Sequence, residues 1–368
     1  DGVLMKYNTE FAIGSKVVSI NDPVYFIADI ASNHDGDLNQ AKELIWQAKE
    51  AGADAVKFQH FLADKIVSDY GFKHLGKQAS HQAAWKKSVF DVYRECECNR
   101  SWSQELADTA NQAGIDFMTT PYDIEAVNEL DKYIPAYKIG SGDITWIDFI
   151  QMIAGKNKPV LLATGASDMC DVARAVEVII NINRNIVLMQ CNTNYTGSLE
   201  NFKYINLNVL KTFSIYYPNM ILGLSDHTPG HATVLGAIAL GARVIEKHFT
   251  IDNKLVGPDH AFSMNPHTWR EMVDRSRELE LAMGNGQKVI EGNESETVIL
   301  QRRCMRFKHD MTKGQVVSMD DVEALRPAPE GAILPYMMSD VVGAKLKEDA
   351  KSGAALMLAN LDMGDKQC

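Results

Sequence analysis

The sequence predicts an α/β fold, a (β/α)8 barrel of the TIM type, followed by a small C-terminal domain. Short apolar runs alternate with segments of helical periodicity across residues 20–284, and this alternation is typical of parallel strands joined by helices. Most runs end in polar or glycine-containing clusters, as barrel strands do at a catalytic mouth. A doubly wound open sheet is the competing fold, but the first strand leads into SNHDGD rather than a glycine-rich phosphate loop.

Each expected element follows from its local pattern. The expected strands are short apolar runs at residues 24–31, 53–58, 116–120, 136–139, 159–163, 186–190, 220–224 and 242–245. The expected helices have apolar residues three and four apart and lie at 38–51, 102–113, 124–130, 147–154, 168–180, 204–213 and 266–283, with an Ala/Leu/Gly-rich segment between the last two strands.

Residues 62–100 interrupt the alternation, because aromatic residues are interleaved there with charges. We expect an extended loop with one helix that lies over the barrel mouth, since long insertions on this side of a barrel are often functional. The expected domains are therefore a barrel at 1–284, a polar glycine-bearing linker at 285–299 and a small mixed domain at 300–368. The last of these is near the lower size limit for folding alone.

The composition excludes several classes of function. The chain has 37 Lys and Arg against 48 Asp and Glu, a net charge of −11, which argues against nucleic acid or an anionic membrane as the main partner. Its apolar runs are too short to span a bilayer. Six cysteines form no pair of C-x-x-C motifs, and no signal peptide is visible, so we expect a reducing cytoplasm.

Two histidines follow the last two expected strands. His227 comes after the run 220–224 in the cluster SDH, and His248 comes after 242–245 in the cluster EKH. Neutral imidazole is a common ligand of divalent metals, and neighbouring strands end close together. The pair therefore predicts a metal site, although a single histidine is more often a surface or satisfied core residue.

Polar residues at the other strand ends extend this site. Lys57 and Lys138 lie inside apolar strands, where a charge is costly unless it is paired or faces a site. Together with hydroxyls and a glycine-rich turn they predict a cradle for phosphate or carboxylate. The residues expected at the mouth are Asp29, Asn33, Lys57, Gln59, Thr120, Lys138, Ser141, Asp143, Tyr195, Ser225, His227, Glu246, His248 and Asp259.

Several of these residues also have a purely structural interpretation. Either lysine could belong to a buried ion pair inside the barrel. Asp29 could stabilise the N-terminal end of the barrel, and Tyr195 could be a packing residue of its loop. A phosphate cradle beside a Lewis acid nevertheless favours carbon–carbon bond formation between a phosphorylated compound and a carbonyl.

The motifs ADIASNHDGD, GADAVKFQ, YKIGSGD, GLSDHT, GARVIEKHFT and GPDHAFS, in this order, resemble those of the N-acetylneuraminate (sialic acid) synthase family, which includes legionaminic and pseudaminic acid synthases. The tail RFKHDMTKGQVVSMDDVEALRP resembles the antifreeze-like (SAF) domain of that family. The resemblance implies condensation of phosphoenolpyruvate with an open-chain N-acylated hexosamine, with release of phosphate. It also implies a divalent metal, Mn²⁺ in the first place with Mg²⁺ or Co²⁺ as alternatives, and a homodimer with a domain-swapped C-terminal domain.

The resemblance also implies roles for individual residues. His227 and His248 match the metal ligands, and Arg326 matches an arginine that reaches the partner's sugar. Residues on the catalytic path are Asp29, Gln59, Asp143, His227 and His248. Substrate-binding residues are Lys57, Thr120, Lys138, Ser141, Thr193, Tyr195, Ser225, Asp259 and Arg326.

The chain departs from the family pattern at four places. Asp29 stands where these synthases usually have Glu, Ala163 replaces a serine of some members, and Thr193 replaces an asparagine or serine. The C-terminal motif reads RPAPEGAILP. These departures favour a modified or dideoxy hexosamine as acceptor at least as much as N-acetylmannosamine. The alternatives are another metal-dependent aldolase or hydrolase on a TIM barrel, and a sugar-binding protein without catalysis.

Overall fold

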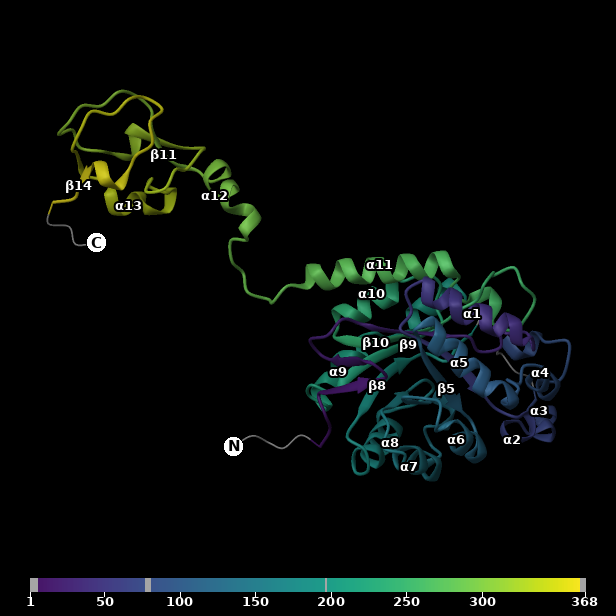
Figure 1. Cartoon of the computed structure of the whole chain (residues 1–368). Helices are drawn as coiled ribbons and strands as arrows, with labels where there is room; N and C mark the ends of the chain where they lie inside the picture. The colour runs from purple at the N-terminus through teal and green to yellow at the C-terminus, as the bar shows by residue number, and fades with distance from the viewer. Residues whose placement is uncertain (1–5, 77–80, 196, 365–368) are drawn as a thin grey trace. The chain divides into compact units, whose positions relative to one another are not determined.

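The computed structural model describes residues 6–76, 81–195 and 197–364. The chain forms two compact units, and the boundary between them along the sequence lies between Gly284 and Asn285 (Figure 1). The first unit packs around the barrel strands, and the second has a small hydrophobic core of its own. No helix among the described residues is long and apolar enough to span a membrane.

The first unit is a closed barrel of eight parallel strands, as predicted. The strands follow one another around the barrel in sequence order, and the last pairs with the first. They are β3 (Tyr25–Asp29), β4 (Ala55–His60), β5 (Asp116–Pro121), β6 (Tyr137–Ile139), β7 (Val160–Ala163), β8 (Ile186–Cys191), β9 (Ile221–Asp226) and β10 (Ala242–His248).

Helices surround the strands on the outside (Figure 1). The helices that connect or follow barrel strands are α1 (Leu38–Glu50), α5 (Ser103–Ala113), α6 (Ile124–Leu130), α7 (Ile147–Ala154), α8 (Met169–Ile180), α9 (Val209–Tyr216), α10 (Ala232–Ala239) and α11 (Pro266–Met283). Asp37 caps α1, since its side chain accepts hydrogen bonds from the amides of Asn39 and Gln40.

Several strands run further than the sequence predicted. β4 includes Gln59 and His60, β9 includes Ser225 and Asp226, and β10 continues to His248. Backbone pairing continues through these polar positions, because ladder hydrogen bonds do not depend on the polarity of the side chain. The polar residues expected just after the strands therefore lie on rigid strand ends.

Two predictions about helices are wrong. The insertion at 62–100 contains three short α-helices rather than one, namely α2 (Ala63–Ile66), α3 (Asp69–His74) and α4 (Val89–Glu95), while residues 77–80 lie outside the described residues. The helix expected at 204–213 is replaced by a 3-10 segment (Leu199–Tyr204) and α9. Asn206 separates these two with a positive φ of 52°, which a continuous helix does not allow.

An antiparallel hairpin precedes the barrel and was not predicted from the polar start of the chain. It consists of β1 (Glu10–Ile13) and β2 (Lys16–Ser19). Its apolar side chains Phe11, Ile13 and Val18 join the buried cluster that contains Tyr25 and Ile27 at the start of β3. The hairpin therefore closes the end of the barrel opposite to the strand ends that carry the polar residues.

The second unit is small and built from short elements. α12 (Ser295–Gln301) lies largely within the segment predicted as a linker. β11 (Cys304–Phe307) pairs with β12 (Val322–Leu325), and β13 (Lys345–Leu346) pairs with β14 (Leu361–Asp362), both antiparallel. Together with α13 (Met338–Val341) they enclose a core that includes Phe307, Val317, Ile333 and Leu356.

Candidate active site

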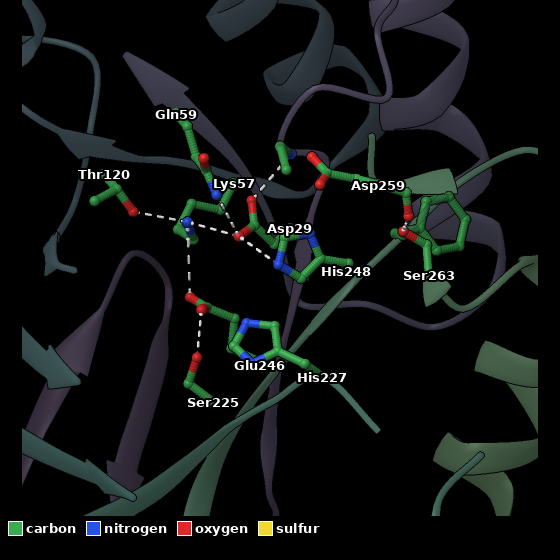
Figure 2. A network of polar contacts seen from close by, with 12 residues as sticks. Asp29, Lys57, Gln59, Thr120, Ser225, His227, Glu246, His248, Asp259 and Ser263 are labelled. Atoms are coloured by element: carbon green, nitrogen blue, oxygen red, sulfur yellow. Dashed lines mark hydrogen bonds and ion pairs between the residues drawn. The ribbon is translucent and has the colours of Figure 1, made fainter. Parts of the chain in front are cut away.

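A layer of charged side chains fills the barrel interior at the C-terminal ends of the strands. Side chains of a strand alternate between its two faces, so Asp29 points to the same side as Ile27, which belongs to the apolar cluster inside the barrel. Lys57 and Glu246 likewise come two residues after Ala55 and Val244 of the same cluster, so their side chains also point into the barrel. Figure 2 shows that these charged groups converge.

Lys57 lies at the centre of the layer and is almost completely buried. Its ammonium nitrogen is 3.0 Å from Oδ2 of Asp29 and 3.9 Å from Oε2 of Glu246. It also donates a hydrogen bond of 2.7 Å to the hydroxyl of Thr120. Gln59 donates to the same Asp29 oxygen at 3.0 Å. The structure therefore brings five of the predicted site residues into one network.

Lys138 and Ser225 complete this network around Glu246. The ammonium of Lys138 is 2.6 Å from Oε1 of Glu246, and the Ser225 hydroxyl donates to the same oxygen at 3.0 Å. Both lysines are thus in buried ion pairs, which agrees with the purely structural interpretation given above for each of them. Because those pairs sit at the barrel mouth, the ammonium groups are also placed to meet an anionic ligand.

Burial and charge set the ionisation of this layer. Burial alone would raise the pKa of Asp29, but the positive charges of Lys57 and Lys138 and the hydrogen bond from Lys57 outweigh it and lower the pKa to about 2. Burial likewise opposes ionisation of Glu246, yet Lys138 and Lys57 lower its pKa below the ordinary value. The layer therefore holds two carboxylates and two ammonium groups whose charges cancel.

The two histidines lie side by side at the same mouth. The ring centroids of His227 and His248 are 5.2 Å apart, and both side chains are buried. Nδ1 of His227 is 3.0 Å from the backbone carbonyl of Asn192. In His248, Nε2 is 3.8 Å from Asp29, while the buried Nδ1 has no hydrogen-bond partner.

These features fit a divalent metal. A ring nitrogen that donates to a backbone carbonyl leaves the other nitrogen as a ligand, which describes His227, and His248 has a buried nitrogen without a partner. Burial lowers the pKa of His248, which favours the neutral ligand form, whereas in His227 the hydrogen bond with Cys191 outweighs burial and raises the pKa. Within the described residues no group of three or more His, Cys, Asp or Glu side chains is arranged for a metal.

Three further predicted residues lie on neighbouring loops. The Ser141 hydroxyl accepts a hydrogen bond of 2.9 Å from the amide of Gly165. A Cβ at Gly165 would lie 1.9 Å from Oγ1 of Thr193 and 2.9 Å from the Ser141 oxygen, so glycine permits their close approach. Asp143 lies in the 3-10 turn that begins at Ser141. Burial raises its pKa to about 6, and its Oδ2 has no partner.

A cavity of about 140 Å³ opens onto this site, and its lining includes Gln59, His248, Tyr195 and Asp259. Asp259 accepts hydrogen bonds from the amide and hydroxyl of Ser32, at 3.1 and 2.6 Å. The ring of Tyr195 stands 4.3 Å from that of His227. The other lining residues are Ser32, Phe61, Ile66, Gln82, Trp85, Val92, Tyr93, Cys96, Tyr122 and Pro258.

The insertion at 62–100 supplies one wall of the cavity through residues such as Trp85 and Tyr93, so its predicted place over the mouth is confirmed. The individual residues of this wall were not predicted, since their spacing follows no regular period. Glu246 was expected at the mouth, but its place between both lysines was not. Arg326 lies in the second unit, where its side chain is exposed.

Comparison with known protein families identifies both units. The model of the NeuB family matches residues 44–288, which lie almost entirely in the barrel unit, and the model of the SAF domain matches residues 302–362. These two matches confirm the resemblance inferred from the motifs.

Known proteins are similar over nearly the whole chain. N,N′-diacetyllegionaminic acid synthase of Legionella pneumophila is 33% identical over 344 residues, covering 92% of this chain and 94% of that protein. Pseudaminic acid synthase of Campylobacter jejuni is 30% identical, covering 90% and 95%. Among solved structures, N-acetylneuraminic acid synthetase of Leptospira borgpetersenii, in complex with citrate, superposes with a TM-score of 0.68 at 27% identity, covering 79% of this chain and 96% of that one.

Proposed function

Because this chain is a synthase that belongs to the NeuB family, we propose that it condenses phosphoenolpyruvate with an open-chain N-acylated hexosamine to a nine-carbon 2-keto sugar acid. The observation that carries the proposal is the convergence of two buried lysines and two buried histidines at one end of the barrel. The names of the relatives do not favour the alternative of a metal-dependent aldolase.

The lysines supply the donor site. Phosphoenolpyruvate carries a phosphate and a carboxylate, and the ammonium groups of Lys57 and Lys138 would bind these anions with the hydroxyls of Thr120, Ser141 and Ser225. Charge attraction is stronger in a buried site than in water, so each ammonium group would contribute more to donor binding here than on an exposed surface. Asp29 and Glu246 hold the lysines in place before the donor enters.

The acceptor would occupy the cavity beside His248. Asp259, Tyr195 and Thr193 would contact the sugar, and the wall formed by residues 62–100 would enclose it. C3 of phosphoenolpyruvate would then attack the aldehyde carbon of the acceptor. Water would add at C2, and the intermediate would expel phosphate by cleavage of the C–O bond.

Proton transfers in this sequence would fall to carboxylates at the mouth. Asp29 is ionised and is oriented by Gln59, so it would accept a proton from the added water. Asp143, with its pKa near 6, would exchange a proton near the new hydroxyl. A divalent metal held by His227 and His248, most simply Mn²⁺ with Mg²⁺ or Co²⁺ as alternatives, would polarise the aldehyde oxygen.

We further propose a homodimer in which the SAF domain of one subunit covers the barrel mouth of the other. Arg326 would then contact the sugar bound by the partner subunit. Mixed Arg326→Ala and His248→Ala subunits should regain part of the activity, because hybrid dimers would contain one intact site. A mixture no more active than the separate variants would contradict domain swapping.

The proposed location is a reducing cytoplasm. The cysteines among the described residues are free thiols, which agrees with such a compartment.

The decisive experiment is release of inorganic phosphate from phosphoenolpyruvate across a panel of N-acylated hexosamines, with Mn²⁺ and then with EDTA. The panel should include N-acetylmannosamine and dideoxy hexosamines carrying two acyl groups. We expect release with one sugar class only, abolished by EDTA. Lys57→Ala and His227→Ala should each reduce the rate by more than about a hundredfold.

His267→Ala is the matched control, because this histidine is exposed on α11 and should leave the rate unchanged. Turnover of an amino sugar without phosphoenolpyruvate, retained in Lys57→Ala, would indicate the aldolase instead. Sugar binding that survives His227→Ala, in a parent chain without turnover, would indicate a binding protein.

A further inference from the structure

A second buried ion pair lies immediately beside the histidine pair, and the chemistry proposed above does not use it. Lys247 precedes His248 on β10, and Asp226 precedes His227 at the end of β9. Lys247 and Asp226 are register partners of the two strands, and both side chains are buried. Because side chains alternate along a strand, this pair points away from the face that carries Glu246 and His248.

Lys247 directs its hydrogen bonds into the loop that carries His227. Its ammonium donates to Oδ2 of Asp226 at 2.7 Å, to the carbonyl of Thr228 at 2.6 Å and to the carbonyl of Gly230 at 2.8 Å. An ammonium group has three donors, and all three are used. Hydrogen bonds from a charged donor are stronger than neutral ones, so the segment directly after His227 is held firmly.

Asp226 holds the same loop from the other side. Its Oδ2 accepts from the hydroxyl of Thr228 at 2.6 Å and from the hydroxyl of Thr233 at 2.9 Å, in addition to Lys247. Thr233 lies in the first turn of α10, so the network joins the ends of β9 and β10 to the next helix.

We propose that Lys247 and Asp226 are positioning residues that fix the separation of the His227 and His248 rings. His248 is the last residue of β10 and is held by the strand, whereas His227 stands in the loop after β9. Lys247 is bonded covalently to His248 and by hydrogen bonds to the segment after His227. The inference rests on the proposed function, because the separation matters only if both rings hold one metal.

The test is the affinity of the full-length chain for Mn²⁺ alone, measured by titration calorimetry without substrates. Lys247→Met keeps the length of the side chain and removes its three donors. We expect Mn²⁺ to bind at least about tenfold more weakly, as for loss of groups that orient metal ligands. His227→Ala should abolish binding, which sets the baseline.

Lys158→Met is the matched control. Lys158 also pairs with a carboxylate, 3.3 Å from Asp131, and donates to the carbonyls of Asp131 and Ile134. It stands before β7, at the opposite end of the barrel. We expect this variant to lose stability while its Mn²⁺ affinity stays that of the parent.

The outcomes distinguish the positioning role of Lys247 from the metal site itself. A folded Lys247→Met chain with parental affinity would overturn the positioning role and leave the metal site standing. Absence of Mn²⁺ binding in the parent, or binding unchanged in His227→Ala, would overturn the metal site and the positioning role together. If Lys247→Met does not fold, Thr233→Val removes one hydrogen bond to Asp226 and should weaken binding about threefold. Unchanged affinity in that variant would overturn the proposal.

Discussion

Two layers of side chains inside the barrel have opposite chemistry, although they stand only two residues apart on the same strands. The layer nearer the β1–β2 hairpin is apolar and includes Ile27, Ala55 and Val244. The layer at the mouth contains their neighbours Asp29, Lys57 and Glu246 in one ionic network. The strands run continuously through both layers, with one register shift between Ala242 and Val244 in the apolar layer, and the polarity of the side chains, not the strand itself, makes the difference.

Within the same strands, the apolar layer therefore contributes to stability and the charged layer to function. Burial of apolar side chains stabilises the fold by roughly 25 cal/mol per Å², and the lower layer makes this contribution. Burial of charges costs solvation energy that ion pairing only partly offsets. The mouth layer therefore weakens the fold or leaves its stability unchanged, and we infer that its charges are kept for the reaction.

The largest expected effect comes from removing charge at the mouth. Lys138→Met combined with Glu246→Leu removes a complete ion pair and leaves the pair of Lys57 with Asp29. We expect the free energy of unfolding to stay the same or rise by about 1–4 kcal/mol, while phosphate release is abolished. Urea unfolding and the phosphate assay measure the two quantities.

The single variant Glu246→Leu is the matching test. It leaves the Lys138 ammonium buried without its partner, so we expect a loss of about 3–5 kcal/mol of stability. If the double variant were as unstable as the single one, the mouth layer would be part of what stabilises the barrel.

A smaller effect concerns pH and Asp143. Burial raises the pKa of this carboxyl from 3.8 to about 6, so the folded chain favours its protonated form. That contribution to stability is full below pH 4 and is lost as the pH rises through 6. Between pH 4 and pH 7.5 the stability of the native chain should therefore fall by about 1–2 kcal/mol relative to Asp143→Asn, allowing for partial exposure. A difference that does not change with pH would mean that Asp143 ionises as it would in water.

The parts of the site that could be predicted lie on regular strands. His227, His248, Lys57 and Lys138 were found because each follows or interrupts an apolar run, and the parallel barrel brings the ends of such runs to one mouth. The pairing of Lys138 with Glu246 could not be predicted, since these residues are 108 positions apart. Their contact depends on which strands face each other across the barrel.

The parts that could not be predicted lie where local pattern and tertiary packing disagree. In the hairpin β1–β2 only β1 has alternating burial, and both strands are too short to be recognised in a polar segment. The three helices of the insertion are each too short to show a helical repeat of apolar residues, which is recognised only over a longer stretch of sequence. The role of Lys247 was hidden because its partners include backbone carbonyls of Thr228 and Gly230, which no side-chain pattern reveals.

The smallest effect is expected in the apolar layer, with Ile27→Val. Ile27 is completely buried, and loss of one methylene should reduce the free energy of unfolding by about 1 kcal/mol. Its neighbour Asp29 is held by Lys57 and Gln59 rather than by Ile27, so KM for phosphoenolpyruvate and kcat should remain at parental values. A change in KM with unchanged stability would show that the apolar layer positions the charges above it, and the separation between the two layers would then fail.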